Sequence, residues 1–152
     1  MKYMKKMLFC VTMLVCLLVM TGCYVKTSMS YNFHIDNGDD IRVTLDTGDK
    51  FKMTSDVPFV ISQNGEALTQ GAFIHGDAYA QYKNAAQTDE KSKVLDSGTK
   101  DGDEYVFWNY DGREYNYVIL VKDSNTGIVL GNTISEESAK ECFNRLTIQS
   151  AK

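Results

Sequence analysis

Residues 105–121 read YVFWNYDGREYNYVILV and form the most apolar part of the chain after its N-terminal segment. At the centre stands Asp111-Gly112, a pair that favours the two-residue type I′ turn of a β-hairpin. A turn of this kind would oppose Tyr110 and Arg113. The pairs expected to follow on the same face are Trp108 with Tyr115, Val106 with Tyr117, and Glu104 with Ile119.

The opposite face of this hairpin would carry Tyr105, Phe107, Val118 and Leu120. Both faces are therefore apolar, and an apolar face must be buried against another element. We expect the hairpin in the interior of a sheet, with a helix covering at least one side.

Shorter strands precede the hairpin. Alternating apolar and polar residues predict three strands within residues 31–53, separated by turns that contain Gly and Asp. A fourth strand covers 57–61, and Asn64-Gly65 predicts a tight hairpin that pairs it with residues 67–74. Pro58 indicates an edge or the entry of that strand, because proline lacks the amide N–H.

Two short helices are predicted. Residues 77–87 contain no Gly or Pro, and Asp77 is the expected N-cap. Residues 135–146 have an acidic first turn, and their apolar positions repeat at helical spacing. Those positions are Ala139, Cys142, Phe143 and Leu146. Residues 97–102 are expected to form a loop, and 128–134 and 147–150 the last strands.

The sum is a single α+β domain over residues 31–150, with about eight mostly antiparallel strands and two helices. An N-terminal meander, a helix after a hairpin, a long central hairpin and a terminal helix with a short strand follow one another. This order is similar to that of the Mog1/PsbP-like α/β/α sandwich. Small lipoproteins of that kind occur in bacterial envelopes, but a fold alone does not define a function.

The N-terminal segment has three parts: cationic residues 1–6, an apolar run from Met7 to Met20, and small residues before Cys23. Met20-Thr21-Gly22-Cys23 resembles the lipobox of bacterial lipoproteins. The resemblance implies a signal peptide over residues 1–22, cleavage between Gly22 and Cys23, and a diacylglycerol on the Cys23 thiol. It also implies a location on the extracytoplasmic side of the cell membrane, with residues 23–30 as a tether.

This segment allows two other interpretations. The run from Met7 to Met20 has 14 residues, whereas a spanning helix needs about 20, so a transmembrane helix is the weaker interpretation. A signal cut by the ordinary secretory peptidase is the closer alternative. The cysteine directly after Thr21-Gly22 favours lipidation.

Composition limits the partners. Loss of residues 1–22 would remove three of 16 basic side chains and none of 20 acidic ones, which leaves a formal charge of −7. That charge argues against nucleic acid and against docking on anionic lipid without an anchor. With Cys23 lipidated, Cys142 would be the last free thiol, and a small buried apolar residue is its expected role.

The aromatic hairpin is the candidate binding surface. Trp108, Tyr110, Arg113 and Tyr115 would share one face, and aromatic residues and arginine are enriched at binding hot spots. An aromatic stripe on a strand more often belongs to the core, so Trp108 and Tyr117 are expected to be buried. Tyr110 and Arg113 flank the turn and are expected to be exposed.

A metal site is a weaker candidate. His34 and Asp36, like His75 and Asp77, stand two residues apart, so one site could join both pairs. Such spacings arise easily by chance. The acidic turns at 36–40 and 123–127 do not match a calcium-binding loop, and turn chemistry explains them better.

No nucleophile motif, phosphate-binding loop or dinucleotide fingerprint is found, and no cofactor is expected. The first hypothesis is a non-enzymatic envelope lipoprotein that binds protein or glycan partners. The alternative is a lipoprotein that binds a small ligand or metal and delivers it to a membrane partner. A hydrolase with unrecognised residues is the third and weakest hypothesis.

Overall fold

The computed structural model of the chain describes residues 27–151, which form an α+β fold made mostly of antiparallel sheet, as predicted. They contain ten strands, the helices α2 (Gly76–Thr88) and α3 (Glu136–Arg145), and the short 3-10 helix η1 (Gly48–Lys50). The strands are β1 (Ser28–His34), β2 (Asp40–Asp46), β3 (Phe51–Met53), β4 (Phe59–Gln63), β5 (Glu66–His75), β6 (Ser92–Lys100), β7 (Asp103–Tyr110), β8 (Glu114–Leu120), β9 (Thr126–Asn132) and β10 (Leu146–Ser150).

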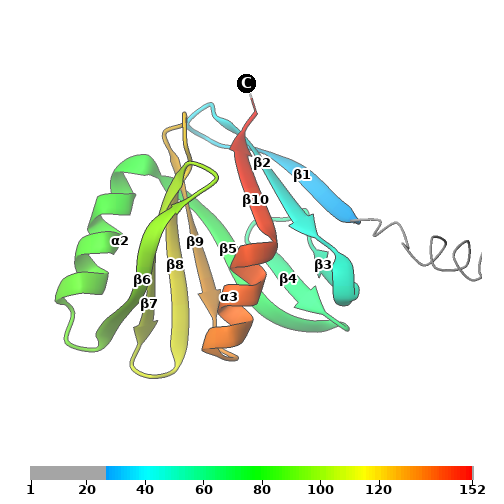
Figure 1. Cartoon of the computed structure of the whole chain (residues 1–152). Helices are drawn as coiled ribbons and strands as arrows, with labels where there is room; N and C mark the ends of the chain where they lie inside the picture. Colours follow the sequence, from blue (N-terminus) through cyan, green and yellow to red (C-terminus); the bar gives the residue numbers. More distant parts are fainter. Residues whose placement is uncertain (1–26, 152) are drawn as a thin grey trace, which may run out of the picture.

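The strands form two sheets (Figure 1). The small sheet has the order β1-β2-β10, and the large sheet the order β3-β4-β5-β9-β8-β7-β6. A common core joins them, in which Ile41 of the small sheet and Phe59 and Ile128 of the large sheet are completely buried. Helix α3 closes the same side, where Phe143 stacks on Tyr117 with ring centroids 4.2 Å apart.

Helix α2 covers the opposite face of the large sheet (Figure 1). Its residues Tyr79 and Ala86 pack against Val106, Trp108 and Val118. The β7–β8 hairpin therefore lies between β6 and β9, with a helix against each of its faces. This confirms the predicted interior position, which follows from the two apolar faces of the hairpin.

Of the two predicted two-residue turns, one is formed and the other is replaced by a longer loop. Asn64-Gly65 makes the predicted two-residue turn, which pairs Gln63 with Glu66. The β7–β8 hairpin instead has a three-residue loop at 111–113, so the predicted register is wrong by one residue.

Asn109 accounts for the longer loop. Its side-chain oxygen accepts the N–H of Gly112 at 2.8 Å, and its amide donates to the carbonyl of Glu114 at 3.2 Å. Asp111 and Gly112 still have positive φ values of 53° and 69°. Arg113 is the extra residue, and Tyr110 pairs with Glu114.

Residues 92–100 form β6, although 97–102 were expected to be a loop. Asp101 and Gly102, with φ values of 54° and 96°, make a two-residue turn that pairs Lys100 with Asp103. The alternation rule fails here because most side chains of this edge strand are exposed. A register shift between Val94 and Asp96 interrupts the pattern further.

The first strand also differs from its prediction. β1 begins at Ser28, three residues before the expected start at Tyr31, so the last residues of the expected tether belong to the sheet. Ser28 pairs with Asp46, and the hydroxyl oxygens of Ser30 and Thr44 lie 2.8 Å apart. Residues 28–30 are too few to show the apolar and polar alternation that predicts a strand, so the sequence did not indicate that β1 begins here.

Helix α2 starts without the expected side-chain cap. Asp77 lies in the first turn, and His75 occupies the cap position without a capping hydrogen bond. The N–H of Gly76 is satisfied by the carbonyl of Asn125 at 2.8 Å. Helix α3 is capped by Ser135, whose side chain accepts the amide N–H three residues on.

Candidate functional site

The register of the β7–β8 hairpin divides the predicted binding surface. Trp108 and Tyr110 lie on the face that packs against α2. Tyr115 lies on the opposite face, against the core between the sheets. A shift of one residue exchanges the faces of a strand, so the grouping of Trp108, Tyr110 and Tyr115 on one face is wrong. Arg113 is exposed in the loop.

Two of the aromatic residues belong to the core, as expected. Trp108 is 8% exposed and Tyr117 is 4% exposed. The Tyr117 ring is stacked between Phe107 and Phe143, with both centroid distances 4.2 Å. Burial, followed by the nearby Tyr105, raises the pKa of the Tyr117 hydroxyl far above its usual value.

A wide groove of about 710 Å³ lies beside α2, over β5 and β9. Gln70 and Ala72 of β5 pair with Gly131 and Val129 of β9 along its floor. Ala72 has only a methyl side chain and Gly131 has none, so this part of the floor is low. Tyr82 of α2, 38% exposed, also lines the groove.

The predicted hairpin tip meets one end of this groove. Glu114 lines the groove and pairs with Tyr110. Tyr110 is half-buried against the α2 cluster, so its expected exposure is wrong. Thr133 adds an exposed hydroxyl. The groove thus combines an aromatic ring, amide, hydroxyl and carboxylate groups with apolar surface, a composition suited to recognition. No sequence motif marks this groove, because its floor consists of small residues from two strands that are distant in the chain.

The histidine candidates come together only in part. His34, Asp36 and His75 line one hollow of about 390 Å³, whose wall also includes Phe73, while Asp77 is not among its lining residues. Asp36 belongs to the turn after β1, not to the strand. The Nδ1 atom of His34 lies 2.8 Å from Asp40.

Among residues 27–151, no group of three or more His, Cys, Asp or Glu side chains is arranged to hold a metal ion. The weak candidate site that would join His34-Asp36 with His75-Asp77 is therefore not formed among these residues. The hollow offers imidazole and carboxylate groups beside apolar surface, which is chemistry for a small organic ligand.

The acidic turn at 36–40 uses its carboxylate to join two loops. The Oδ2 atom of Asp39 accepts hydrogen bonds from the N–H of Asn125 and the hydroxyl of Thr126, both at 2.8 Å. Asn37 donates to the carbonyl of Asn125 at 2.9 Å. These contacts give the acidic segment a structural role, which is to hold the two loops together.

Cys142 is completely buried on α3, as expected for a small apolar residue. Burial raises the pKa of its thiol above the usual value, although Thr69 lowers it. The thiolate is the nucleophilic form, so this environment does not activate Cys142.

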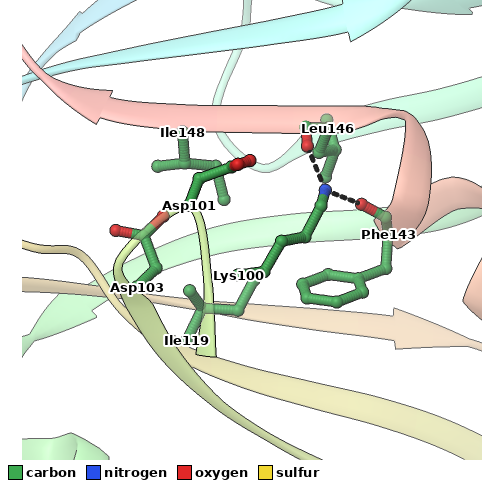
Figure 2. Close-up of a pocket in the computed structure, with 7 residues that line it drawn as sticks. All are labelled: Lys100, Asp101, Asp103, Ile119, Phe143, Leu146 and Ile148. Atoms are coloured by element: carbon green, nitrogen blue, oxygen red, sulfur yellow. Dashed lines mark hydrogen bonds between the residues drawn. The ribbon is translucent and has the colours of Figure 1, made fainter. Parts of the chain in front are cut away.

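Lys100 joins the two sheets at the far end of α3 (Figure 2). Its Nζ donates to the carbonyls of Phe143 at 2.8 Å, Asn144 at 3.3 Å, and Leu146. It also lies 4.8 Å from the centre of the Phe143 ring. A cation at the C-terminus of a helix complements its dipole, so Lys100 caps α3 and fixes the start of β10.

A charged cleft of about 430 Å³ opens beside this lysine. Asp103, only 6% exposed, accepts the N–H of Lys122 at 2.8 Å and lines the cleft with Asp101 and Asp123. Burial raises the pKa of the Asp103 carboxyl, although its hydrogen bond with Lys122 lowers it. Residues 148–150 of β10 form the other wall.

No known protein family matches this sequence, and no curated protein is similar enough to count as a relative. The predicted signal peptide, its cleavage site at Gly22 and Cys23, and the lipidated Cys23 lie outside the described residues. Within residues 27–151, the helices are too short or too polar to cross a membrane.

Proposed function

We propose that the chain is a lipid-anchored protein of the bacterial envelope whose domain binds a protein or glycan partner without catalysing a reaction. The lipobox-like Met20-Thr21-Gly22-Cys23 supports the anchor. A diacylglyceryl group supplies the two acyl chains that stable attachment needs. No cofactor takes part in this proposal.

The start of β1 at Ser28 limits the distance between the domain and the lipid anchor of this proposal. Five residues from a lipidated Cys23 to Ser28, at no more than ~3.6 Å each, span roughly 18 Å. The domain would therefore work close to the membrane surface, and its partner would be a molecule of that layer.

The groove beside α2 is the observation that carries the binding role. Its 710 Å³ lie open over the sheet, with Tyr82 at the wall and Val129, Gln70 and Thr133 within reach of an occupant. Tyrosine offers a large contact area at low conformational cost, and its hydroxyl adds a hydrogen bond.

The fold supports the same proposal in a coarser way. Helix α2 covers one face of the seven-stranded sheet, while α3 and the small sheet cover the other. We infer a relation to the Mog1/PsbP-like sandwich from this layering and from the order of elements.

A second candidate function is delivery of a small ligand, and the hollow at His34 and His75 favours it. A thermal-shift screen with small organic acids and sugars would test it. A rise in the melting temperature that His75→Ala removes would support this function, and no shift with any compound would speak against it.

A photo-crosslinking amino acid at position 82 tests the groove in intact cells. The matched control carries the same amino acid at Val94, which is also 38% exposed but does not line the groove. We expect a discrete crosslinked product from position 82 only. Equal products from both positions, or none from position 82, would contradict the groove as the binding site.

A further inference from the structure

β10 is an edge strand with unpaired main-chain groups. It pairs only with β2 among the described strands. The N–H of Ala151 donates to the carbonyl of Asp40, and the regular register places Gln149 and Thr147 in the same orientation. Main-chain groups alternate in direction along a strand, so those of Ile148 and Ser150 point away from β2.

The outward edge of β10 faces the charged cleft. Ile148 and Ser150 line it on one side, and Asp101, Asp103 and Asp123 line it on the other. Figure 2 shows Asp101, on the turn between β6 and β7, and Asp103, at the start of β7, near Ile148. An extended chain placed in the cleft would therefore meet a strand edge and a row of carboxylates at once.

Lys100 limits how much of the outward edge of β10 can pair with another strand. Its Nζ already binds the carbonyl of Leu146, so strand pairing can begin only beyond that residue. Strand β6, an edge of the large sheet, is interrupted by a register shift and carries Lys93 and Asp96, features that protect an edge from pairing. β10 has no such interruption.

The charges of the cleft indicate what kind of peptide segment would bind there. Three carboxylates line the cleft with one ammonium, that of Lys122, whose side chain lies over Gly102. Lys100 also lies near Asp101 and Asp103, but its ammonium donates to the carbonyls at the end of α3. Because alternate side chains of an added strand point to the same side, every second residue of the occupant would meet these carboxylates. Cationic side chains at those positions would complement them.

We propose that β10 accepts an extended cationic segment of a partner protein as a fourth strand of the small sheet. Its main chain pairs with Ile148 and Ser150, and its Lys or Arg side chains contact Asp101, Asp103 and Asp123. This is the β-augmentation mode of peptide recognition. The inference names a second surface, distinct from the groove, and rests on the proposed function only in taking the partner to be a protein.

Synthetic peptides test the proposal with the full chain in a neutral detergent. The probe is the blocked heptapeptide Lys-Val-Lys-Val-Lys-Val-Lys, and calorimetry measures its Kd. Two further versions carry N-methyl groups either on the Val amides or on the Lys amides, with the same charge. Strand pairing predicts that one isomer binds like the parent and the other loses binding. Equal affinity of the two isomers, whether high or low, would overturn the pairing.

Variants of the cleft test the charge. Asp101 and Asp123 both have positive φ (54° and 57°), a conformation that asparagine tolerates, so D101N with D123N keeps the turns. Neutralising two exposed carboxylates should weaken the peptide about tenfold. The matched control is D111N with D56N, which removes equal charge at exposed turn positions elsewhere.

Removal of a positive charge from the cleft should instead increase the affinity. Lys122→Ala removes the ammonium that lines the cleft and should lower the Kd of the cationic peptide several-fold. Equal losses in the cleft pair and the control pair, equal binding of Glu-Val-Glu-Val-Glu-Val-Glu, or no binding of the parent peptide would overturn the proposal. None of these outcomes depends on Cys23 or on the groove, so failure here leaves the proposed function standing.

Discussion

Lys100→Met is predicted to destabilise the domain strongly. The Lys100 ammonium binds carbonyls at the end of α3 and the start of β10, with distances of 2.8 Å to Phe143 and 3.3 Å to Asn144, and a further bond to Leu146. Methionine keeps most of the apolar stem beside the Phe143 ring. The substitution therefore removes the charge and its hydrogen bonds more than the packing.

The expected loss follows from these contacts. Hydrogen bonds to a charged group contribute about 1.5–3 kcal/mol, and a cation at a helix C-terminus contributes ~0.3–1 kcal/mol. We expect a loss of about 3 kcal/mol in the free energy of unfolding. With roughly 0.26 kcal/mol/K of unfolding entropy for residues 27–151, the melting temperature should fall by about 11 °C.

Urea and thermal unfolding followed by circular dichroism measure this effect. The matched control is Lys93→Met on the same strand, where the lysine is exposed and the change should stay within about 0.5 kcal/mol. A Lys100→Met protein as stable as the Lys93→Met protein would refute the capping role of Lys100.

Three other predictions concern buried polar groups. Asn132, which is 2% exposed, donates hydrogen bonds to Thr69 at 2.9 Å and to Ser138 at 3.0 Å. Asn132→Ala should therefore lower the free energy of unfolding, measured in urea, by about 2–4 kcal/mol. A loss under ~1 kcal/mol would contradict this. Burial raises the pKa of the Tyr117 hydroxyl above the value of about 10 that it has in the unfolded chain. Its contribution to the unfolding free energy is therefore complete below pH ~10 and is lost as the pH rises further. Tyr117→Phe should flatten this alkaline decline of the unfolding free energy, and an unchanged decline would exclude that role. Cys142, completely buried with a raised pKa, should react with iodoacetamide only in denaturant, and rapid labelling of the folded chain would show that the site opens.

The apolar patterns predicted the elements that build the core. The two apolar faces of residues 105–121 predicted the interior hairpin, and Asn64-Gly65 predicted a turn that the structure contains. Both signals are local, since turn conformation and strand alternation depend on neighbouring residues.

The register of the β7–β8 hairpin was not predictable from the turn residues alone. Asp111-Gly112 adopts the expected positive φ values, but the side chain of Asn109 favours a loop one residue longer. This single residue separates Tyr115 from Trp108 and so removes the predicted aromatic surface.

The candidate sites depend on contacts between distant segments. Lys100 meets the end of α3 more than forty residues further along the chain, and Asp39 meets Asn125 across 86 residues. No periodicity encodes such pairs. The β10 edge is similar, because an unpaired strand edge is a property of sheet order, which the alternation of residues 147–150 does not reveal.

The anchor at Cys23 is the central claim, and mass spectrometry of the chain isolated from the membrane fraction of its host tests it most directly. The account predicts an N-terminal peptide that begins at Cys23 and carries a diacylglyceryl group on its thiol. It also predicts that Cys23→Ala abolishes this modification. An unmodified peptide that begins before Cys23, or a soluble chain with a free Cys23 thiol, would contradict the account.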